Sequence, residues 1–240
     1  MGWLDDPVVE GKAKWESDPV VAPAPSTRAA AAEKPAIEIK AGVQVPQLLQ
    51  PSANPYSAGN YPLGRKYTVG DWATFLESDI LTGIQQRILT SRVTRVDVDA
   101  DRVEFNNGGM ITDLMGNLVK TPAIEYAAPQ QVIPAEIQVG KKWTAVYSQR
   151  RNGGKKTTAV VDIAIAHREK ISVPAGTFDT FRIEGYGWNM TTSARVEIRV
   201  WLVPGLNFQI KKEVIVRERE RWIDATRLEL VSLQQQVLET

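Results

Sequence analysis

Polar and apolar residues alternate with a period of two over much of the chain between positions 66 and 233. The segments Arg92–Val98 and Arg102–Phe105 follow this pattern, and Arg195–Leu202 keeps it throughout. Successive side chains of a strand point to opposite faces, so this period predicts half-buried β-strands rather than helices. Thr158–Ala166 is instead a run of β-branched and small residues, which predicts a strand that crosses the core.

Turn-forming residues separate these strand candidates. Asn and Gly accept the positive φ angles that tight hairpin turns need. The turn candidates are Asn106–Gly109, Met115–Asn117, Asn152–Gly154 and Pro174–Gly176. With many short strands, short turns and no strong helical pattern, the sequence predicts an all-β fold, either an antiparallel sandwich or an open half-barrel.

Two charged segments interrupt the alternation. Gln209–Trp222 is expected to be one strand with less strict alternation. Its part Val214–Trp222 carries five consecutive charges of alternating sign in its second half, which suits a protected sheet edge or a charged interface. Arg150–Lys156 is expected to be a basic hairpin tip. We interpret this tip as a solubilising loop, because it contains no aromatic residues on which nucleic-acid bases could stack.

The first 63 residues differ from the rest of the chain in composition and pattern. The phrase W-x-x-D-P-V-V occurs at Trp3–Val9 and again at Trp15–Val21, and residues 22–46 are rich in Ala and Pro. A segment with so little large apolar surface cannot offset the entropy lost on ordering. The sequence therefore predicts that an extended, largely irregular N-terminal tail precedes the β domain.

Each copy of the repeated phrase is interpreted as a docking peptide for a neighbouring protein subunit. A Trp anchor contributes strongly to a small interface, and two tethered copies raise avidity through effective concentration. The alternative is a relic of gene fusion or duplication. The expected partner-binding residues are Trp3, Asp6, Pro7, Val8, Val9, Trp15, Asp18, Pro19, Val20 and Val21.

These observations give an expected domain organisation. Val69-Gly70 before Trp72 resembles Val139-Gly140 before Trp143, which indicates either two related halves or two similar strand starts. The expected segments are the docking peptides at 1–21, a linker and lead-in at 22–63, the antiparallel β domain at 64–234 with possible halves 66–133 and 134–234, and a tail at 235–240.

The amino-acid composition argues against several kinds of partner and active site. The formal net charge of +1 gives no reason to expect a specific nucleic-acid partner. Cysteine is absent and His167 is the single histidine, which excludes disulfides, thiolate nucleophiles and multi-histidine metal sites. No apolar run reaches the ~20 residues of a transmembrane helix. No signal-peptide pattern begins the chain, so export by the usual route is not expected.

No motif for catalysis emerges, and a non-enzymatic protein without catalytic residues, cofactor or metal is expected. P-loop, dinucleotide and nucleophile-elbow patterns are missing from the sequence. His167 is expected to be a solvated residue at a strand end. The carboxylate pairs Glu77 with Asp79 and Glu184 with Glu197 are expected to face solvent. A hydrolase centred on one of these groups is the least favoured hypothesis.

Residues 134–233 resemble a bacterial family of β-rich proteins of unknown function, most of them predicted to be periplasmic. The matching segments are Val139–Trp143, Val173–Glu184, Trp201–Gly205 and Glu229–Ser232. This resemblance implies an antiparallel half-barrel or sandwich and carries no catalytic residues. The doubled phrase at positions 1–21 is similar to tags at the start of phage and prophage proteins, including virion-associated ones.

Two functional hypotheses remain open. In the first, the protein is a structural or adaptor component of a phage virion or its assembly, located in the virion or the host cytoplasm. Its partners would be other protein subunits, in an assembly or a homo-oligomer. In the alternative, it is an envelope-associated β half-barrel that binds an apolar ligand or a partner peptide, in the periplasm if a signal sequence has been removed.

Overall fold

The computed structural model describes residues 61–236, and over this range the chain consists of β-strands joined by turns. The predicted docking peptides and most of the predicted linker lie outside the described residues. The strands are β1 (Tyr61–Pro62), β2 (Trp72–Asp79), β3 (Gln85–Asp97), β4 (Arg102–Phe105), β5 (Met110–Thr112), β6 (Leu118–Lys120), β7 (Ile124–Tyr126), β8 (Glu136–Ile137), β9 (Lys142–Arg151), β10 (Lys156–Val173), β11 (Gly176–Asn189), β12 (Ala194–Leu202), β13 (Lys211–Glu218) and β14 (Arg221–Gln234).

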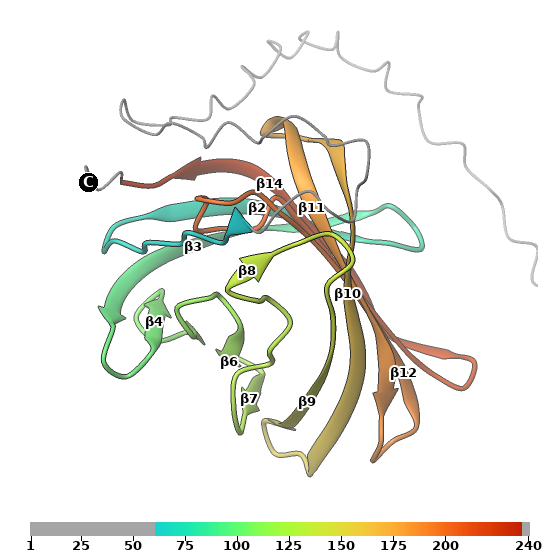
Figure 1. The fold of residues 1–240 in the computed structure, drawn as a ribbon. Coiled ribbons are helices and arrows are strands. Elements are labelled where there is room, and N and C mark those ends of the chain that lie inside the picture. Colours follow the sequence, from blue (N-terminus) through green and yellow to red (C-terminus); the bar gives the residue numbers. More distant parts are fainter. Residues whose placement is uncertain (1–60, 237–240) are drawn as a thin grey trace, which may run out of the picture. The chain divides into compact units, whose positions relative to one another are not determined.

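Twelve of these strands form one closed antiparallel barrel, and β1 pairs separately with β8. Around the barrel each strand lies beside the next one in the sequence, so the topology is an up-and-down meander (Figure 1). The circle closes where β14 pairs with β2, with Gln234 opposite Trp72. Strands from both predicted halves, 66–133 and 134–234, contribute to this single barrel.

The predicted sandwich or open half-barrel is therefore wrong. A period of two tells which face of a strand is buried, but it does not tell which strand pairs with which. Closure depends on the pairing of β14 with β2 and of β7 with β9, which are contacts between distant parts of the chain or across a long loop. No local pattern in the sequence encodes either contact.

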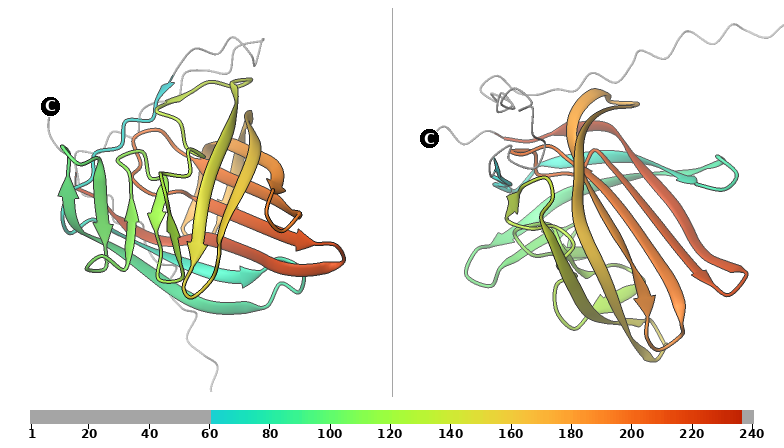
Figure 2. Two further views of the ribbon diagram at one scale, coloured as in Figure 1. Left: turned by 90° about the horizontal axis from the view of Figure 1, so that it is seen from below. Right: turned by 45° about the vertical axis from the view of Figure 1, so that its right-hand side comes forward.

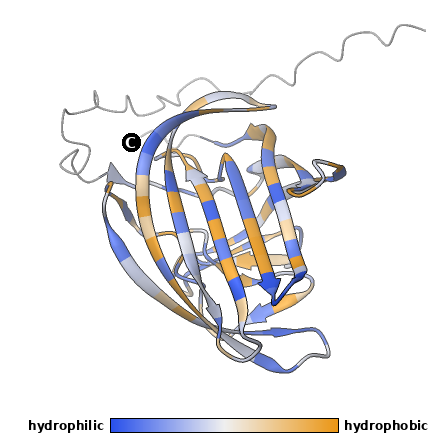
Figure 3. Cartoon of the chain, turned by 90° about the vertical axis from the view of Figure 1, so that its right-hand side faces the viewer, coloured by the Kyte–Doolittle hydropathy of each residue, from blue (hydrophilic) through white to orange (hydrophobic). Residues whose placement is uncertain are grey.

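Apolar and polar residues alternate along the long strands (Figure 3). Residues of one phase are buried inside the barrel, and those of the other phase lie on its outer face. The run that was expected to cross the core lies in β10, where Val161, Ile163 and Ile165 are buried inside the barrel. Asp162, between them, is exposed on the outer face. The inner positions from Ala159 to Ile165 are thus all apolar, whereas the outer face combines Asp162 with Val160 and Ala164.

The segment expected to be one strand over Gln209–Trp222 forms two strands. Arg217 pairs with Trp222 and Glu218 with Arg221, so Arg219 and Glu220 make a tight turn between β13 and β14. Arg219 adopts a φ of 52° there, although it is neither Gly nor Asn. The expected sheet edge is also wrong, because β13 has a partner on each side.

The two ends of the barrel differ. The turns that follow β9, β11 and β13 lie at one end, which we call the mouth (Figure 2). The predicted basic hairpin tip is confirmed as one of them, with Arg150 opposite Lys156. At the other end, which we call the plugged end, the lead-in 63–71 and the loop 203–210 are hydrogen-bonded to each other, and the segment 127–141 contains β8.

Candidate ligand-binding cavity

A cavity of about 450 Å³ lies inside the barrel next to the mouth, and we call it the outer chamber. It extends from buried strand residues to exposed residues of the mouth turns, including Lys155, Thr192 and Glu218. This lining connects the chamber to solvent. Its apolar wall is formed by Leu118, Ile124, Val196, Ile198, Val214 and Val216.

Small residues on the inner faces of the strands leave this space open. Ala159 on β10 and Ala194 on β12 are buried residues of the chamber lining. Gly185 and Gly187 occupy inward positions of β11 between these strands, opposite Ile163 and Val161. Small residues along β10 to β12 therefore contribute to the open volume.

Two tyrosines stand in the chamber wall. The rings of Tyr126 and Tyr147 meet edge to face with centroids 5.9 Å apart. Gln130 Nε2 donates a hydrogen bond of 3.0 Å to the Tyr126 hydroxyl. Burial raises the pKa of Tyr147 to about 12, and it raises the pKa of Tyr126 as well. Both phenols are therefore neutral at physiological pH and can donate hydrogen bonds to a ligand.

Lys212 is the charged residue at the deepest level of the outer chamber. It pairs with Val200 on one side and Leu228 on the other, so its side chain points into the barrel. Burial lowers the pKa of Lys212, while the Asp224 carboxylate acts in the opposite direction. The sequence contains a signal for this residue, because Lys212 lies in the same alternation phase as Ile210, Val214 and Val216.

A second cavity of about 150 Å³, the inner chamber, lies between Lys212 and the plugged end. Leu118, Gln130 and Lys212 line both chambers. Arg65 reaches into the inner chamber from the lead-in and donates a 2.6 Å hydrogen bond from Nη1 to the Met115 carbonyl. Among the described residues, no Asp or Glu lines this chamber.

A buried polar cluster holds the plugged end together. Asp71 accepts hydrogen bonds from the backbone N–H groups of Thr68 (3.0 Å) and Gln236 (2.7 Å) and from Asn207 Nδ2 (2.9 Å). The Asn207 backbone N–H donates to the Gln235 side chain. The cluster thus joins the lead-in, the loop after β12 and the end of β14.

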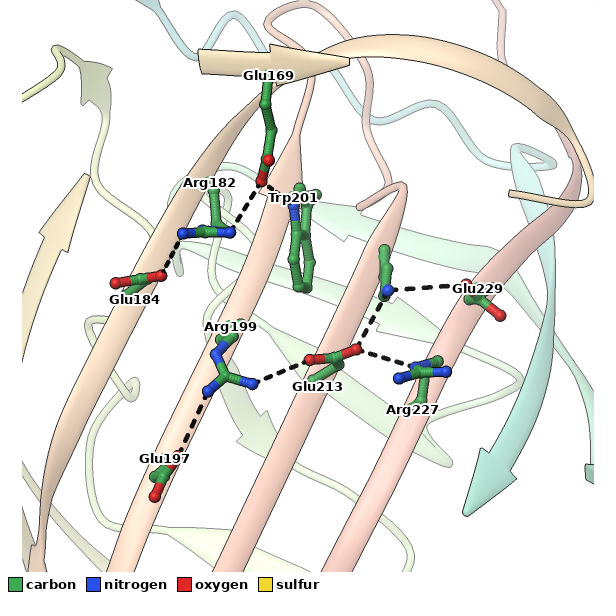
Figure 4. Close-up of polar contacts among 10 residues, drawn as sticks. Glu169, Arg182, Glu184, Glu197, Arg199, Trp201, Glu213, Arg227 and Glu229 are labelled. Carbon is green, nitrogen blue, oxygen red and sulfur yellow. Dashed lines mark hydrogen bonds and ion pairs between the residues drawn. The ribbon is translucent and has the colours of Figure 1, made fainter. Parts of the chain in front are cut away.

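The outer face of β11 to β14 carries a network of charges (Figure 4). Glu213, at its centre, is 6% exposed and contacts three cations: Arg227 at 2.9 Å, Lys211 at 3.1 Å and Arg199 at 3.3 Å. Burial alone would raise the pKa of Glu213, but Lys211 and Arg227 outweigh it and lower the pKa. We interpret this network as a stabilising feature of the sheet.

Replacing Glu213 by Gln is expected to lower the free energy of unfolding by about 2 kcal/mol, because three cations lose a partly buried partner. Since the folded pKa is depressed, the contribution is present above 4.5, the ordinary pKa of a glutamate, and is lost as the pH falls through the folded pKa. Urea unfolding at several pH values measures both effects.

Glu229→Gln is the matched control for this network. Glu229 contacts a single cation, Lys211, at 3.8 Å, so its loss should cost less than about 0.5 kcal/mol. Equal losses from the two substitutions would contradict the central role of Glu213.

The catalytic candidates do not line either chamber. His167 lies 3.7 Å from Glu169, but the Glu169 carboxylate also binds Trp201 and Arg182. The carboxylates of the two candidate pairs have separate partners: Glu77 binds Arg87, Asp79 accepts from Thr82, Glu184 binds Arg182, and Glu197 binds Arg195 and Arg199. Neither pair is arranged around a shared reaction site.

Metal-ligating clusters and membrane-spanning helices can be assessed for residues 61–236. In this range, no three His, Asp or Glu side chains gather as they would around a metal ion. The same range contains no helix with the length and apolar character needed to cross a bilayer.

No protein-family model and no curated protein sequence matches the chain. Solved structures similar to it include an inferred exported protein with a YmcC-like fold from Bacteroides fragilis, at 13% identity and a TM-score of 0.47, covering 74% of this chain and 100% of the other. An inferred lipoprotein from Parabacteroides distasonis has 12% identity and a TM-score of 0.42, with 72% and 98% covered. The hypothetical lipoprotein YmcC of Escherichia coli has 9% identity and a TM-score of 0.45, with 67% and 83% covered.

These similarities agree with the expected resemblance to β-rich bacterial proteins of unknown function. The three proteins are described as exported proteins or lipoproteins, and they give no support to the phage resemblance of positions 1–21. At such identities and TM-scores, the similarities carry no conclusion about a ligand.

Proposed function

We propose that the protein is a non-enzymatic binding protein that holds an apolar small molecule inside its barrel. The observation that carries this proposal is the outer chamber, a cavity of about 450 Å³ that has an apolar wall and reaches solvent at the mouth. Ligand pockets commonly enclose roughly 300–1,000 Å³ and combine apolar walls with a few polar groups. Tyr126, Tyr147 and Lys212 are such groups here.

The cost of leaving this volume empty supports the proposal. Protein interiors are packed nearly as densely as organic crystals, and unfilled apolar volume lowers stability. Larger residues in place of Ala159 and Ala194 could fill the space. A chain that keeps small residues at these positions retains room for another molecule.

The proposal follows the alternative hypothesis drawn from the sequence, that of a β domain with an apolar ligand. An envelope location stays a prediction. The virion hypothesis depends on the peptides at 1–21, which lie outside the described residues, and the docking role of Trp3 and Trp15 also stays a prediction.

The direct experiment is to purify the full-length protein, extract it with organic solvent and identify what is released by mass spectrometry. We expect a small apolar molecule at close to one per chain. The delipidated protein should then bind the uncharged fluorophore N-phenyl-1-naphthylamine saturably. The proposal fails if no molecule is released and the fluorophore binds without saturation.

A cavity-filling substitution tests whether the ligand binds in the outer chamber. Val214→Trp puts a large side chain into the outer chamber, and we expect fluorophore binding to weaken on the order of tenfold. Ile215→Trp is the matched control, because Ile215 is the next residue of β13 and points to the outer face. The fluorophore is excited at wavelengths longer than those that tryptophan absorbs. The added tryptophan therefore does not interfere with the measurement of its fluorescence in either variant. Equal loss in the two variants would place the ligand elsewhere.

A further inference from the structure

Lys212 stands at the deepest level of the outer chamber and is partly buried there. Val216, on the same strand, lies near the mouth. Lys212 is four residues from it, which places Lys212 roughly 13 Å deeper along the strand. The wall between them is apolar and includes Val214 and Ile198. A ligand entering from the mouth therefore meets apolar surface first and an ammonium group last.

Within residues 61–236, the Lys212 ammonium has no hydrogen bond and no ion pair. The nearest acidic groups are committed to other partners. Asp224 accepts a hydrogen bond from the Thr226 hydroxyl and acts on Lys212 only at longer range. Glu77 lies two strands away at the same level, and its carboxylate accepts hydrogen bonds from Arg87 Nε and Nη2.

An unpaired cation among apolar side chains is costly, because it loses its hydration without gaining a counter-charge. The inner chamber adds to this imbalance. Arg65 also lines it, the Arg65 Nη2 atom is buried without a hydrogen-bond partner in the described part of the chain, and no carboxylate of that part faces the chamber. Two cations therefore share the inner chamber without a carboxylate in its lining, whereas the outer chamber also has Asp224 and Glu218 in its lining.

We propose that the natural ligand is an apolar molecule with one acidic group, which pairs with Lys212 while its apolar body fills the outer chamber toward the mouth. This inference rests on the proposed function and names the chemical class of its ligand. A carboxylate or phosphate oxygen would accept a charge-assisted hydrogen bond from the ammonium, which gains strength in an apolar surrounding. The cations Arg151, Lys155 and Lys212 outnumber the carboxylates Glu218 and Asp224 in the outer-chamber lining, so the chamber carries a net positive charge that favours an acidic ligand.

The test compares two molecules that share one chain and differ in charge, dodecanoate and dodecanol. Each displaces N-phenyl-1-naphthylamine from the full-length protein at pH 7.5. Lys212→Met should weaken dodecanoate about tenfold or more relative to dodecanol, because only the acid loses a charge-assisted hydrogen bond. Lys155→Met, which removes a cation at the mouth, is the matched control and should change the ratio of the two affinities by less than about twofold.

Lys212→Met removes an unpaired buried charge, so we expect the variant to fold, and its binding of the fluorophore reports an intact chamber. An unchanged ratio of acid to alcohol affinity in Lys212→Met overturns this inference and leaves the proposed function standing. Failure of the wild-type protein to bind the fluorophore overturns the proposed function itself. A fall in the ratio in Lys212→Met but not in Lys155→Met supports both.

Discussion

Replacing Asp71 by Ala is expected to lower the free energy of unfolding by about 3 kcal/mol. The side chain is 1% exposed and accepts hydrogen bonds from two backbone N–H groups and one side-chain amide. Alanine would leave these three donors without their acceptor, and each buried unsatisfied donor costs about 1–3 kcal/mol. The removal of a carboxylate from a buried position offsets part of that cost. Urea denaturation of the full-length protein measures the difference.

Asp97→Ala is the matched control for Asp71. Asp97 also accepts a hydrogen bond from a backbone N–H, that of Ala100, and it contacts Arg95, but its side chain is 31% exposed. Water can replace both contacts, so we expect a loss of about 0.5 kcal/mol. If the two substitutions cost the same, the cluster at the plugged end is not what secures the end of β14.

Replacing Gly187 by Ala is the second substitution for which we expect a large effect. A Cβ atom at this position would lie 2.0 Å from the Val160 carbonyl oxygen and 2.6 Å from the Val161 Cα atom. Both are backbone atoms of β10, so the two strands must move apart to admit a methyl group. We expect a loss of about 3 kcal/mol, measured by thermal or urea unfolding.

Gly185→Ala provides the control in the same strand and on the same face. Its Cβ would approach only side-chain atoms, Val161 Cγ1 at 3.0 Å and Ile163 Cγ1 at 3.5 Å. Side chains can shift more easily than backbone, so about 1 kcal/mol is expected. Neither glycine has a φ in the left-handed region, so the difference between them reports packing alone. A larger loss at Gly185 would show that close strand contact does not determine the effect.

The local part of the fold could be predicted from the sequence. The segments Arg102–Phe105 and Arg195–Leu202 match β4 and β12 closely, because alternation records which side chains are buried. Arg92–Val98 covers only the second half of β3, which begins at Gln85. The turn at Arg219 was missed, since Arg-Glu-Arg gives no turn signal and the bend depends on pairing between β13 and β14. The closure of the barrel was missed for the same reason, as it depends on contacts between distant strands.

Part of the candidate site could likewise be predicted from the sequence, and part could not. The inward position of Lys212 could have been predicted, because a lysine in the apolar phase of a strand is unusual. The chamber itself could not, since it depends on where small residues of several strands meet across a closed barrel. The sequence drew attention to His167 and to pairs of carboxylates, and the structure gives these groups structural partners on the barrel wall.

The closure of the barrel between β14 and β2 also has a consequence for engineering the chain. Gln234 and Trp72 are opposite each other in neighbouring strands, and such partners lie only about 5 Å apart. A short linker between them, with new ends opened in the exposed turn at Asn152–Gly154, would keep the pairing of all twelve barrel strands. It would remove the lead-in before Trp72, and with it the β1–β8 pair and the Asp71 cluster. The fold is therefore suited to circular permutation, which would place both termini beside the mouth and allow a reporter domain to be fused there.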